Sequence, residues 1–324
     1  MTAVSYHETV NDLHALGLAG KGPFARATWF QLLEQAGHLP FVATISDSRG
    51  AIALPLTQAG GGLDVLTNWY AFTWTPLATP DAPDSLLDNL AHALREKGRL
   101  HFSKLPLADA GALERAFRNS GWRVRREACD TNHYLDVQGR SFADYLATRP
   151  GPLRTTLKRK AKKVEVRLTN TFDAADWAAY EEIYQASWKP EEGDPAMLRA
   201  FAQAESAAGH FRFALALADG VPVAAQFWTV EQGTAYIHKL AHLPSAEPLS
   251  PGTTLTAALM EQVMDRDKVA HVDFGTGNDR YKADWMEQVR ARYALTCLRP
   301  GNPRHWGELA RWTMRKLVSR KATG

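Results

Sequence analysis

The chain contains little cysteine and no long apolar run. Its 324 residues include two cysteines, Cys129 and Cys297, which are too few for a disulfide framework or a cysteine metal cluster and fit a reducing compartment. No stretch approaches the roughly 18 uninterrupted apolar residues that a membrane-spanning helix needs. The N-terminal residues also lack the basic and apolar regions of a signal peptide. The sequence therefore predicts a cytoplasmic protein.

Neither sign of charge dominates the chain, whose net charge is +3, but the cations are unevenly distributed. Residues 149–167 carry +7 and residues 299–324 carry +6, so the rest of the chain carries −10. This pattern predicts local contacts with anions rather than general binding of nucleic acid. Hydrophobic residues make up 45% of the chain, which is ample for a packed core, and the length predicts two domains.

Apolar periodicity and turn signals predict two successive mixed α/β units. In the first half we expect helices at Trp29–Ala36, Ser85–Lys97 and Asp109–Ser120, with strands at Phe41–Ile45, Ala51–Leu56, Leu63–Thr67, Arg99–Lys104, Trp122–Glu127 and His133–Val137. In the second half we expect helices at Phe142–Thr148, Leu153–Lys163, Asp176–Trp188, Pro195–Ala207 and from Thr253, with strands at Phe211–Ala218, Pro222–Val230, Thr234–His242, Ala270–Phe274 and Arg290–Cys297. The dipeptide Asp219-Gly220 predicts a hairpin between two of these strands. The similar order of elements in the two halves indicates a duplicated fold.

The most informative motif begins at Leu249 and reads Leu-Ser-Pro-Gly-Thr-Thr-Leu. Pro251 and Gly252 mark the start of a helix, whose first amides have no partner inside the helix and are suited to hold an anionic group such as a diphosphate. Ser250 or Thr253 would alternatively only cap that helix. About twenty residues later, a strand runs into Gly-Thr-Gly-Asn-Asp-Arg-Tyr-Lys. A helix start that accepts phosphate, followed by a strand with polar groups at its end, indicates a transferase with a phosphorylated carrier. The alternative is a glycine-bounded helix followed by a strand, which α/β proteins contain routinely.

Two other segments of the chain are rich in basic residues. Arg154, Lys158 and Lys162 lie at helical spacing on one stripe, where they hold a phosphorylated acceptor or a tRNA backbone, or form a solvated face. Residues 304–321 predict an amphipathic helix that either rests on an anionic membrane face or caps its own domain or a dimer partner.

Several other polar residues belong to the predicted sheet. Trp188, Gln226 and Tyr236 are expected to line one cavity, although core packing is the commoner explanation for an isolated aromatic residue. His238 and His242 are four residues apart on a strand and hence share a face; His238 is included among the substrate-binding candidates. They have no third ligand at metal spacing, so no metal site is predicted.

From about residue 141 to Cys297 the sequence resembles GNAT-superfamily acyltransferases of the FemAB-like type, the branch associated with cellulose and exopolysaccharide biosynthesis. The resemblance depends on the order of five segments: Arg154–Lys163, Tyr184–Lys189, Phe213–Ala225, Ser250–Thr253 and Asp273–Lys282. It implies tandem GNAT-like domains, with a degenerate domain at 1–140, a catalytic domain at 141–299 and a basic tail at 300–324. One departure concerns the phosphate loop, which in the family carries Arg or Gln and several glycines, whereas here Gly252 stands alone.

The resemblance also implies roles for individual residues. Ser250, Gly252, Thr253 and Thr254 would hold the diphosphate of acyl-CoA, as acetyl-CoA or a longer thioester, or the carrier would be an aminoacyl-tRNA. Lys282 would neutralise a donor phosphate or the oxyanion, Tyr281 would protonate the leaving thiolate, and Asp273 would orient the acceptor amine or take its proton. Alternatively, Lys282 is a solvated lysine and Asp273 bonds to nearby backbone.

The sequence thus predicts a cytoplasmic, acyl-CoA-dependent N-acyltransferase, as a monomer or homodimer. The acceptor amine, on a sugar, lipid or envelope-polysaccharide precursor, would attack the thioester directly in a ternary complex, because neither cysteine lies in a nucleophile context. One alternative is an aminoacyl-tRNA-dependent transferase that modifies a cell-wall precursor. Another is an acyltransferase for a long-chain amine at the membrane surface, at the inner face. A third is a non-catalytic regulator that senses an anionic ligand.

Overall fold

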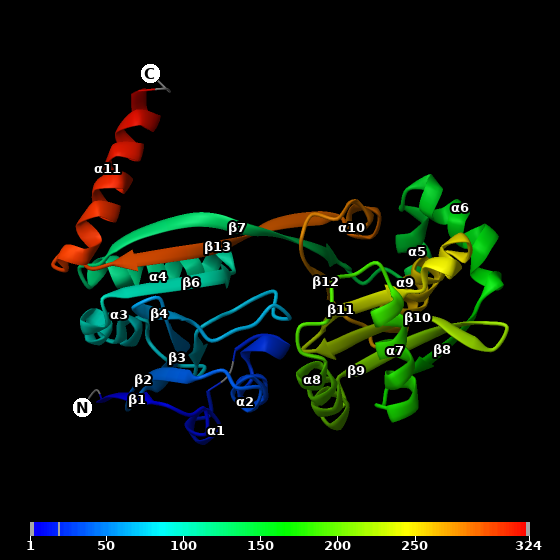
Figure 1. Ribbon diagram of the computed structural model, residues 1–324, viewed down its shortest axis with the longest axis horizontal. Helices are drawn as coiled ribbons and strands as arrows, with labels where there is room; N and C mark the ends of the chain where they lie inside the picture. Colours follow the sequence, from blue (N-terminus) through cyan, green and yellow to red (C-terminus); the bar gives the residue numbers. More distant parts are fainter. Residues whose placement is uncertain (1–2, 19, 322–324) are drawn as a thin grey trace. The chain divides into compact units, whose positions relative to one another are not determined.

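The computed structural model describes residues 3–18 and 20–321 (Figure 1). Contacts divide the chain into two compact units, and the first unit extends to Asp130 and resumes at Ala291. The strands β7 (Arg123–Asp136) and β13 (Gln288–Leu298) each cross a unit boundary. Residues 291–298 therefore group with the first unit, where β13 pairs with β6 (Arg99–Leu105), rather than with the domain predicted for 141–299.

Each unit is a mixed α/β body, as the sequence predicts. In the first unit the strand order is β1 (Ala3–His7), β2 (Pro40–Asp47), β3 (Gly50–Ala59), β4 (Gly62–Val65), β6 and β13, with β5 (Leu77–Ala78) beside β3. Its helices are α1 (Asp12–Ala15), α2 (Ala27–Gln35), α3 (Asp84–Ala93), α4 (Leu107–Asn119) and α11 (Trp306–Lys321). None of the helices in the described ranges is both long and apolar enough to cross a membrane.

In the second unit the strand order is β7, β12 (His271–Thr276), β11 (Thr234–His242), β10 (Val221–Glu231), β9 (Phe211–Ala218) and β8 (Glu165–Thr169). Its helices are α5 (Phe142–Ala147), α6 (Gly151–Lys160), α7 (Ala174–Ala186), α8 (Pro195–Ala207), α9 (Pro251–Glu261) and α10 (Arg280–Trp285). The predicted hairpin at Asp219-Gly220 is confirmed: both residues have positive φ, of 51° and 78°, as a two-residue turn of the primed type requires.

Helices cover both faces of the second sheet (Figure 1). On one face, Leu157 of α6 and Leu255 of α9 pack in the same core as Trp228 of β10. On the other face, Trp177 of α7 and Phe201 of α8 pack against Phe227, with ring centroids 5.4 and 5.8 Å apart. Neighbouring residues of β10 thus point to opposite faces, as the strand period of two dictates.

The strands predicted at Trp122–Glu127 and His133–Val137 are wrong as separate elements, because β7 is continuous between them. Its middle residues are exposed and polar, so the apolar alternation that would reveal a strand is missing there. The glycine turn expected after Phe274 is followed by the short helix α10, which the sequence did not indicate. These are the parts of the fold that depend least on a buried face.

A bulge interrupts β11 at His238. Phe227 pairs with Lys239, but the next residue, Trp228, pairs with Ile237, so His238 is an extra residue in the strand. A bulge changes which face the following side chains occupy. His238 therefore faces α8, whereas His242 lies beside the start of α9, and the predicted common face of the two histidines is wrong.

Candidate functional site

Two parallel strands of the second unit pair over a short ladder and then diverge. The ladder between β11 and β12 contains three residue pairs, from Thr234–His271 to Tyr236–Asp273. After it, β11 continues towards the start of α9, whereas β12 continues into the turn that precedes α10. In α/β sheets, ligands bind beyond the carboxyl ends of parallel strands where the chain departs in different directions. The two motifs identified in the sequence flank this point.

The backbone at the start of α9 lies close to β11. Ser250 has a left-handed backbone with φ of 52°, and Pro251, which lacks an N–H, occupies the first helical position. Gly252 lies against β11: a Cβ there would stand 3.3 Å from Cδ1 of Leu240 and 3.7 Å from Cδ2 of His242. In the part of the chain described, Ser250 does not cap the helix through its side chain, so the capping alternative is wrong for this residue.

A cation that the sequence analysis did not select lies at this helix start. Nζ of Lys160, in the last turn of α6, donates a hydrogen bond to Oγ of Ser250 over 3.1 Å. A lysine ammonium has three donors, so it has capacity to hold an anion as well. The run of cations that contains Lys160 was visible in the sequence, but the prediction selected the stripe of Arg154 and Lys158 within that run. Both of those residues lie on the exposed face of α6.

Gln226 stabilises the start of α9 through hydrogen bonds instead of contacting a substrate. Its Nε2 donates to the carbonyl oxygen of Gly252 (2.9 Å) and to Oγ1 of Thr256 (2.7 Å). Its Oε1 accepts a hydrogen bond from Nε1 of Trp228 over 2.8 Å. The side chain is buried, and its amide is used within the core. The predicted substrate contact of Gln226 is therefore corrected to a positioning role.

Asp273 is also held within the protein. Its carboxylate accepts hydrogen bonds from Asn132 Nδ2 (2.7 Å), the Gly275 amide (2.9 Å) and Arg290 (2.8 Å). The side chain is only 3% exposed. The contacts of this carboxylate are made inside the protein, and its burial leaves it poorly placed to contact an acceptor. The alternative in which Asp273 bonds to nearby backbone describes this arrangement, and the proposed base role is not supported.

Replacing Asp273 by alanine tests this assignment. We expect a loss of about 2 kcal/mol in the free energy of unfolding, because the buried amide of Asn132 and the Gly275 N–H each lose a partner. Urea denaturation measures the change. The shape of the pH profile of the acyl transfer that the sequence predicts should stay that of the parent protein. A profile that loses its acidic limb would show that Asp273 is the base after all.

Tyr281 and Lys282 lie together in the first turn of α10, after the turn that follows β12. Nζ of Lys282 donates to the carbonyl oxygen of Thr276 and forms an ion pair with Asp279 at 3.4 Å. The Lys282 side chain is buried, so the alternative of a solvated surface lysine is wrong. The ring of Tyr281 packs edge-on against Phe274, and burial, followed by the charge of Asp279, raises the pKa of its phenol to about 12. The phenol is therefore protonated at neutral pH.

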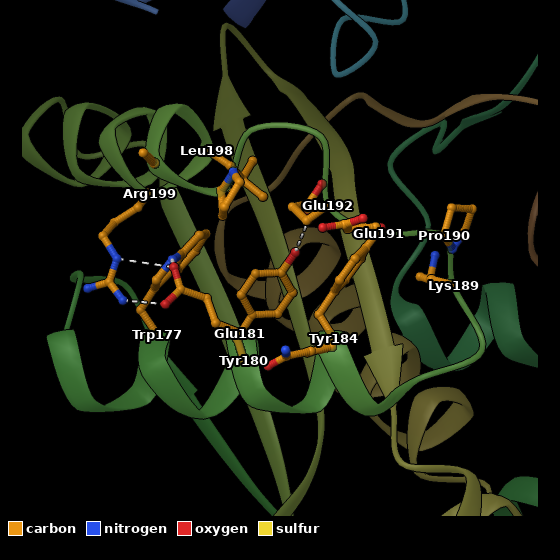
Figure 2. A pocket seen from close by; sticks show the side chains of 13 residues that line it. Trp177, Tyr180, Glu181, Tyr184, Lys189, Pro190, Glu191, Glu192, Leu198 and Arg199 are labelled. Atoms are coloured by element: carbon orange, nitrogen blue, oxygen red, sulfur yellow. Dashed lines mark hydrogen bonds and ion pairs between the residues drawn. The ribbon is translucent and has the colours of Figure 1, made fainter.

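A pocket with a volume of about 760 Å³ lies between α7 and α8 (Figure 2). Aromatic rings form much of its lining, and several charged side chains surround them. Its lining residues are Trp177, Tyr180, Glu181, Tyr184, Gln185, Lys189, Pro190, Glu191, Glu192, Pro195, Ala196, Leu198 and Arg199. The segment between the two helices supplies four of these residues, from Lys189, the last residue of the Tyr184–Lys189 motif, to Glu192. Size and composition are those of a small-molecule site.

An ion pair connects this pocket to β11. Oε1 of Glu192 lies 2.8 Å from Nζ of Lys239, and Oε2 accepts a hydrogen bond from the Tyr180 hydroxyl over 3.1 Å. The bulge at His238 is what turns Lys239 to this side of the sheet. Burial lowers the pKa of Lys239 to about 8, and the charge of Glu192 opposes that shift. Neither residue was selected from the sequence, although a lysine within an apolar strand was a signal.

The loop after α7 links the pocket to both motifs. The exposed ring of Trp188 lies 4.3 Å from that of His242, beside Gly252. Burial lowers the pKa of Lys189; Asp279 opposes this shift and Lys282 reinforces it, which places Lys189 in the electrostatic field of the turn before α10. The start of α9, the turn before α10 and the pocket between α7 and α8 are therefore parts of one region of the second unit.

The remaining predicted substrate residues lie within the sheet. The His238 ring stacks on Phe227 at 5.1 Å, and its Nε2 shares a hydrogen bond of 2.8 Å with Oγ1 of Thr229. Tyr236 pairs with Asp273 across the parallel ladder, and burial raises the pKa of its phenol to about 12. In the ranges that the structure describes, no group of three His, Cys, Asp or Glu side chains is placed to hold a metal ion.

Comparisons with known proteins agree with this architecture. Residues 151–283 match the family model described as the acetyltransferase (GNAT) domain. This segment runs from the start of α6 into α10 and includes the pocket, the start of α9 and Lys282. Over these residues the second unit is therefore similar to the GNAT acetyltransferase domain. No curated protein matches the sequence.

Solved structures are similar in fold to most of the chain. The structure of FemX is similar with a TM-score of 0.63 at 8% identity, and the match covers 90% of this chain and 96% of that one. L-PGS from Bacillus licheniformis gives 0.60 at 14% identity, with 90% of each chain covered. A tandem GNAT protein from the clavulanic acid biosynthesis pathway gives 0.53 at 12% identity, with 93% and 100% covered. The tandem GNAT-like fold predicted from the sequence is confirmed.

Proposed function

We propose that this protein is an acyltransferase that moves an acyl group from acyl-CoA to an amine. The acceptor amine belongs to a sugar, lipid or envelope-polysaccharide precursor and attacks the thioester directly in a ternary complex. The GNAT fold supports the reaction class, and the arrangement around α9 supports the donor. Burial raises the pKa of Cys297, and Cys129 belongs to the first unit, so a direct transfer without a cysteine intermediate fits the chain.

The observation that carries the proposal is the contact of Lys160 with Ser250 at the start of α9. The first-turn amides of Gly252 and Thr253 supply N–H donors, and the helix dipole adds positive potential there. Lys160 adds a full positive charge 3.1 Å from Oγ of Ser250. Gly252, which has no Cβ, lets this turn lie close against β11. Together these groups match the charged end of a CoA thioester.

The pocket between α7 and α8 is proposed to hold the acceptor. Glu192, fixed by Lys239 and Tyr180, has further oxygen lone pairs with which to orient the acceptor amine. The amine nitrogen forms its bond to the acyl carbon, the C–S bond breaks, and the proton that the nitrogen loses is balanced by the proton that the thiolate takes up. Lys282 has a third N–H beyond its contacts with Thr276 and Asp279, and this N–H is available to the oxyanion. The protonated phenol of Tyr281 is a suitable proton source for the thiolate.

Replacing Lys160 by alanine tests the donor site. We expect the dissociation constant for acetyl-CoA to rise about tenfold, because one charge-assisted contact of roughly 1.4 kcal/mol is lost. Isothermal titration calorimetry measures the change. Lys158→Ala, which removes an exposed cation from the same helix, is the matched control and should raise the constant by less than about threefold. An equal effect of the two substitutions, or acetyl-CoA that fails to bind the parent protein, would contradict the proposal.

A second candidate changes the donor to an aminoacyl-tRNA, which the exposed cations of α6 favour. Binding of tRNA depends steeply on salt, since each phosphate contact releases a counterion. A third candidate, an acyltransferase for a long-chain amine at the membrane surface, is favoured by the exposed Trp306 and Met314 of α11. Deletion of residues 303–324 should then abolish binding to anionic liposomes, which the proposed soluble reaction does not require.

A further inference from the structure

The exposed face of α6 carries more positive charge than a free nucleotide donor needs. Residues 151–164 contain six cations and no acidic residue. Leu153 and Leu157 are buried against α9, which turns the cations outwards. In the described chain, none of the ion pairs found involves a cation of this segment. The exposed cations are Arg154, Lys158, Arg159, Lys162 and Lys163.

This surface is continuous with the donor site. Lys160 belongs to the same helix and reaches Ser250 at the start of α9. Lys160 and the helix start lie at the place proposed for the diphosphate. The other five cations of 151–164 lie on the exposed surface of the same segment. A donor whose charged end is much larger than that of CoA would use them.

We infer that this surface, which lies beside the proposed donor site, docks an acidic acyl carrier protein whose phosphopantetheine arm carries the acyl group. The arm is chemically the same in CoA and in a carrier protein, so one phosphate-binding helix start accepts both. The acceptor nitrogen forms its bond to the acyl carbon, the C–S bond breaks, and the carrier protein leaves with a free thiol. The inference rests on the proposed acyl transfer and names the source of its acyl group.

The extent of the patch favours a small acidic partner over a nucleic acid. The ten residues of α6 span about 15 Å, and its basic surface continues only through the following turn, Ala161–Lys163. Glu165 and Asp176 then interrupt the run of cations. One acidic helix covers such a surface, whereas a folded nucleic acid needs phosphate contacts over a wider area.

The test compares two donors on two variants of the full chain. The probes are an acyl-CoA and a type II acyl carrier protein that carries the same acyl group on its phosphopantetheine. The charge-reversed variant is Arg154→Glu/Lys158→Glu/Lys162→Glu. The matched control reverses three exposed arginines of the first unit, Arg115→Glu/Arg123→Glu/Arg304→Glu. Calorimetry gives the dissociation constants, and circular dichroism checks that each variant is folded.

We expect the parent protein to bind the acylated carrier protein, and the α6 variant to lose at least about tenfold more affinity for it than for acyl-CoA. The control should lose neither. Equal losses for both donors would overturn the inference, because α6 would then only meet the phosphates of CoA. Binding of acyl-CoA without binding of the carrier protein would also overturn it and leave the proposed function standing. Failure of both donors to bind the parent protein would remove the proposed function itself.

Discussion

Substituting valine for Gly252 is expected to lower the affinity for acyl-CoA by about 100-fold or more. The Cβ of the new residue would stand 3.3 Å from Cδ1 of Leu240 and 3.7 Å from Cδ2 of His242, so the branched side chain would push the first turn of α9, with its amides, away from β11. A diphosphate could no longer reach those amides, and a hundredfold change corresponds to about 2.7 kcal/mol. The cost to helix formation is only a fraction of 1 kcal/mol, since glycine is itself a weak helix former.

Calorimetric titration of acetyl-CoA into the variant measures this effect. Gly307→Val is the matched control, because a Cβ there meets nothing within 4 Å, and it should bind like the parent. If the Gly252→Val variant does not fold, Gly252→Ala provides the same test with one added carbon, and only the flexible end of Leu240 must move. A folded variant that binds acetyl-CoA as tightly as the parent would show that the donor lies elsewhere.

Local signals in the sequence explain why much of the fold was predictable. Pro251 and Gly252 define a helix start by their own backbone preferences, and Asp219-Gly220 defines a hairpin by positive φ. The buried strands β9 to β11 show apolar runs that need no tertiary information. β7 lacked such a signal because its exposed middle residues do not alternate with apolar ones. Its continuity depends on pairing with distant strands.

The candidate site was predictable only in part, for a related reason. The sequence indicates the helix start at Gly252 and the turn before Lys282, because the residues of each motif are contiguous in the chain. The sequence alone does not distinguish Lys160 from the other cations of α6, because the difference between them comes from the packing of α6 on α9. Lys239 was hidden by the bulge, which arises from the register between β10 and β11 and has no local signature. The pocket itself depends on how α7 and α8 pack.

Replacing Glu192 by glutamine is expected to lower the free energy of unfolding by about 3 kcal/mol at pH 7. The substitution leaves the charge of Lys239 buried without its partner, which costs more than the pair contributes. Lys239 is only 8% exposed, so water cannot replace the lost carboxylate fully. The Tyr180 hydroxyl retains an acceptor in the glutamine oxygen. Urea denaturation measures the loss, and Glu191→Gln, which alters the exposed neighbouring carboxylate, should change the stability by less than about 0.5 kcal/mol.

The pH dependence of this loss identifies its cause. In the folded protein the pKa of Lys239 is lowered to about 8, below that of the unfolded chain, which is about 10.4. The unfolded state therefore binds more protons between these values, and the contribution of Lys239 to stability rises with pH across this window. Above pH 8 the lysine becomes neutral in both proteins, so the difference between Glu192→Gln and the parent should shrink by about pH 9.5.

Adding Lys239→Met should restore most of the stability at pH 7, because no unpaired charge remains. A loss that persists unchanged at high pH, or in the double variant, would mean that Glu192 stabilises the pocket by packing rather than by its charge.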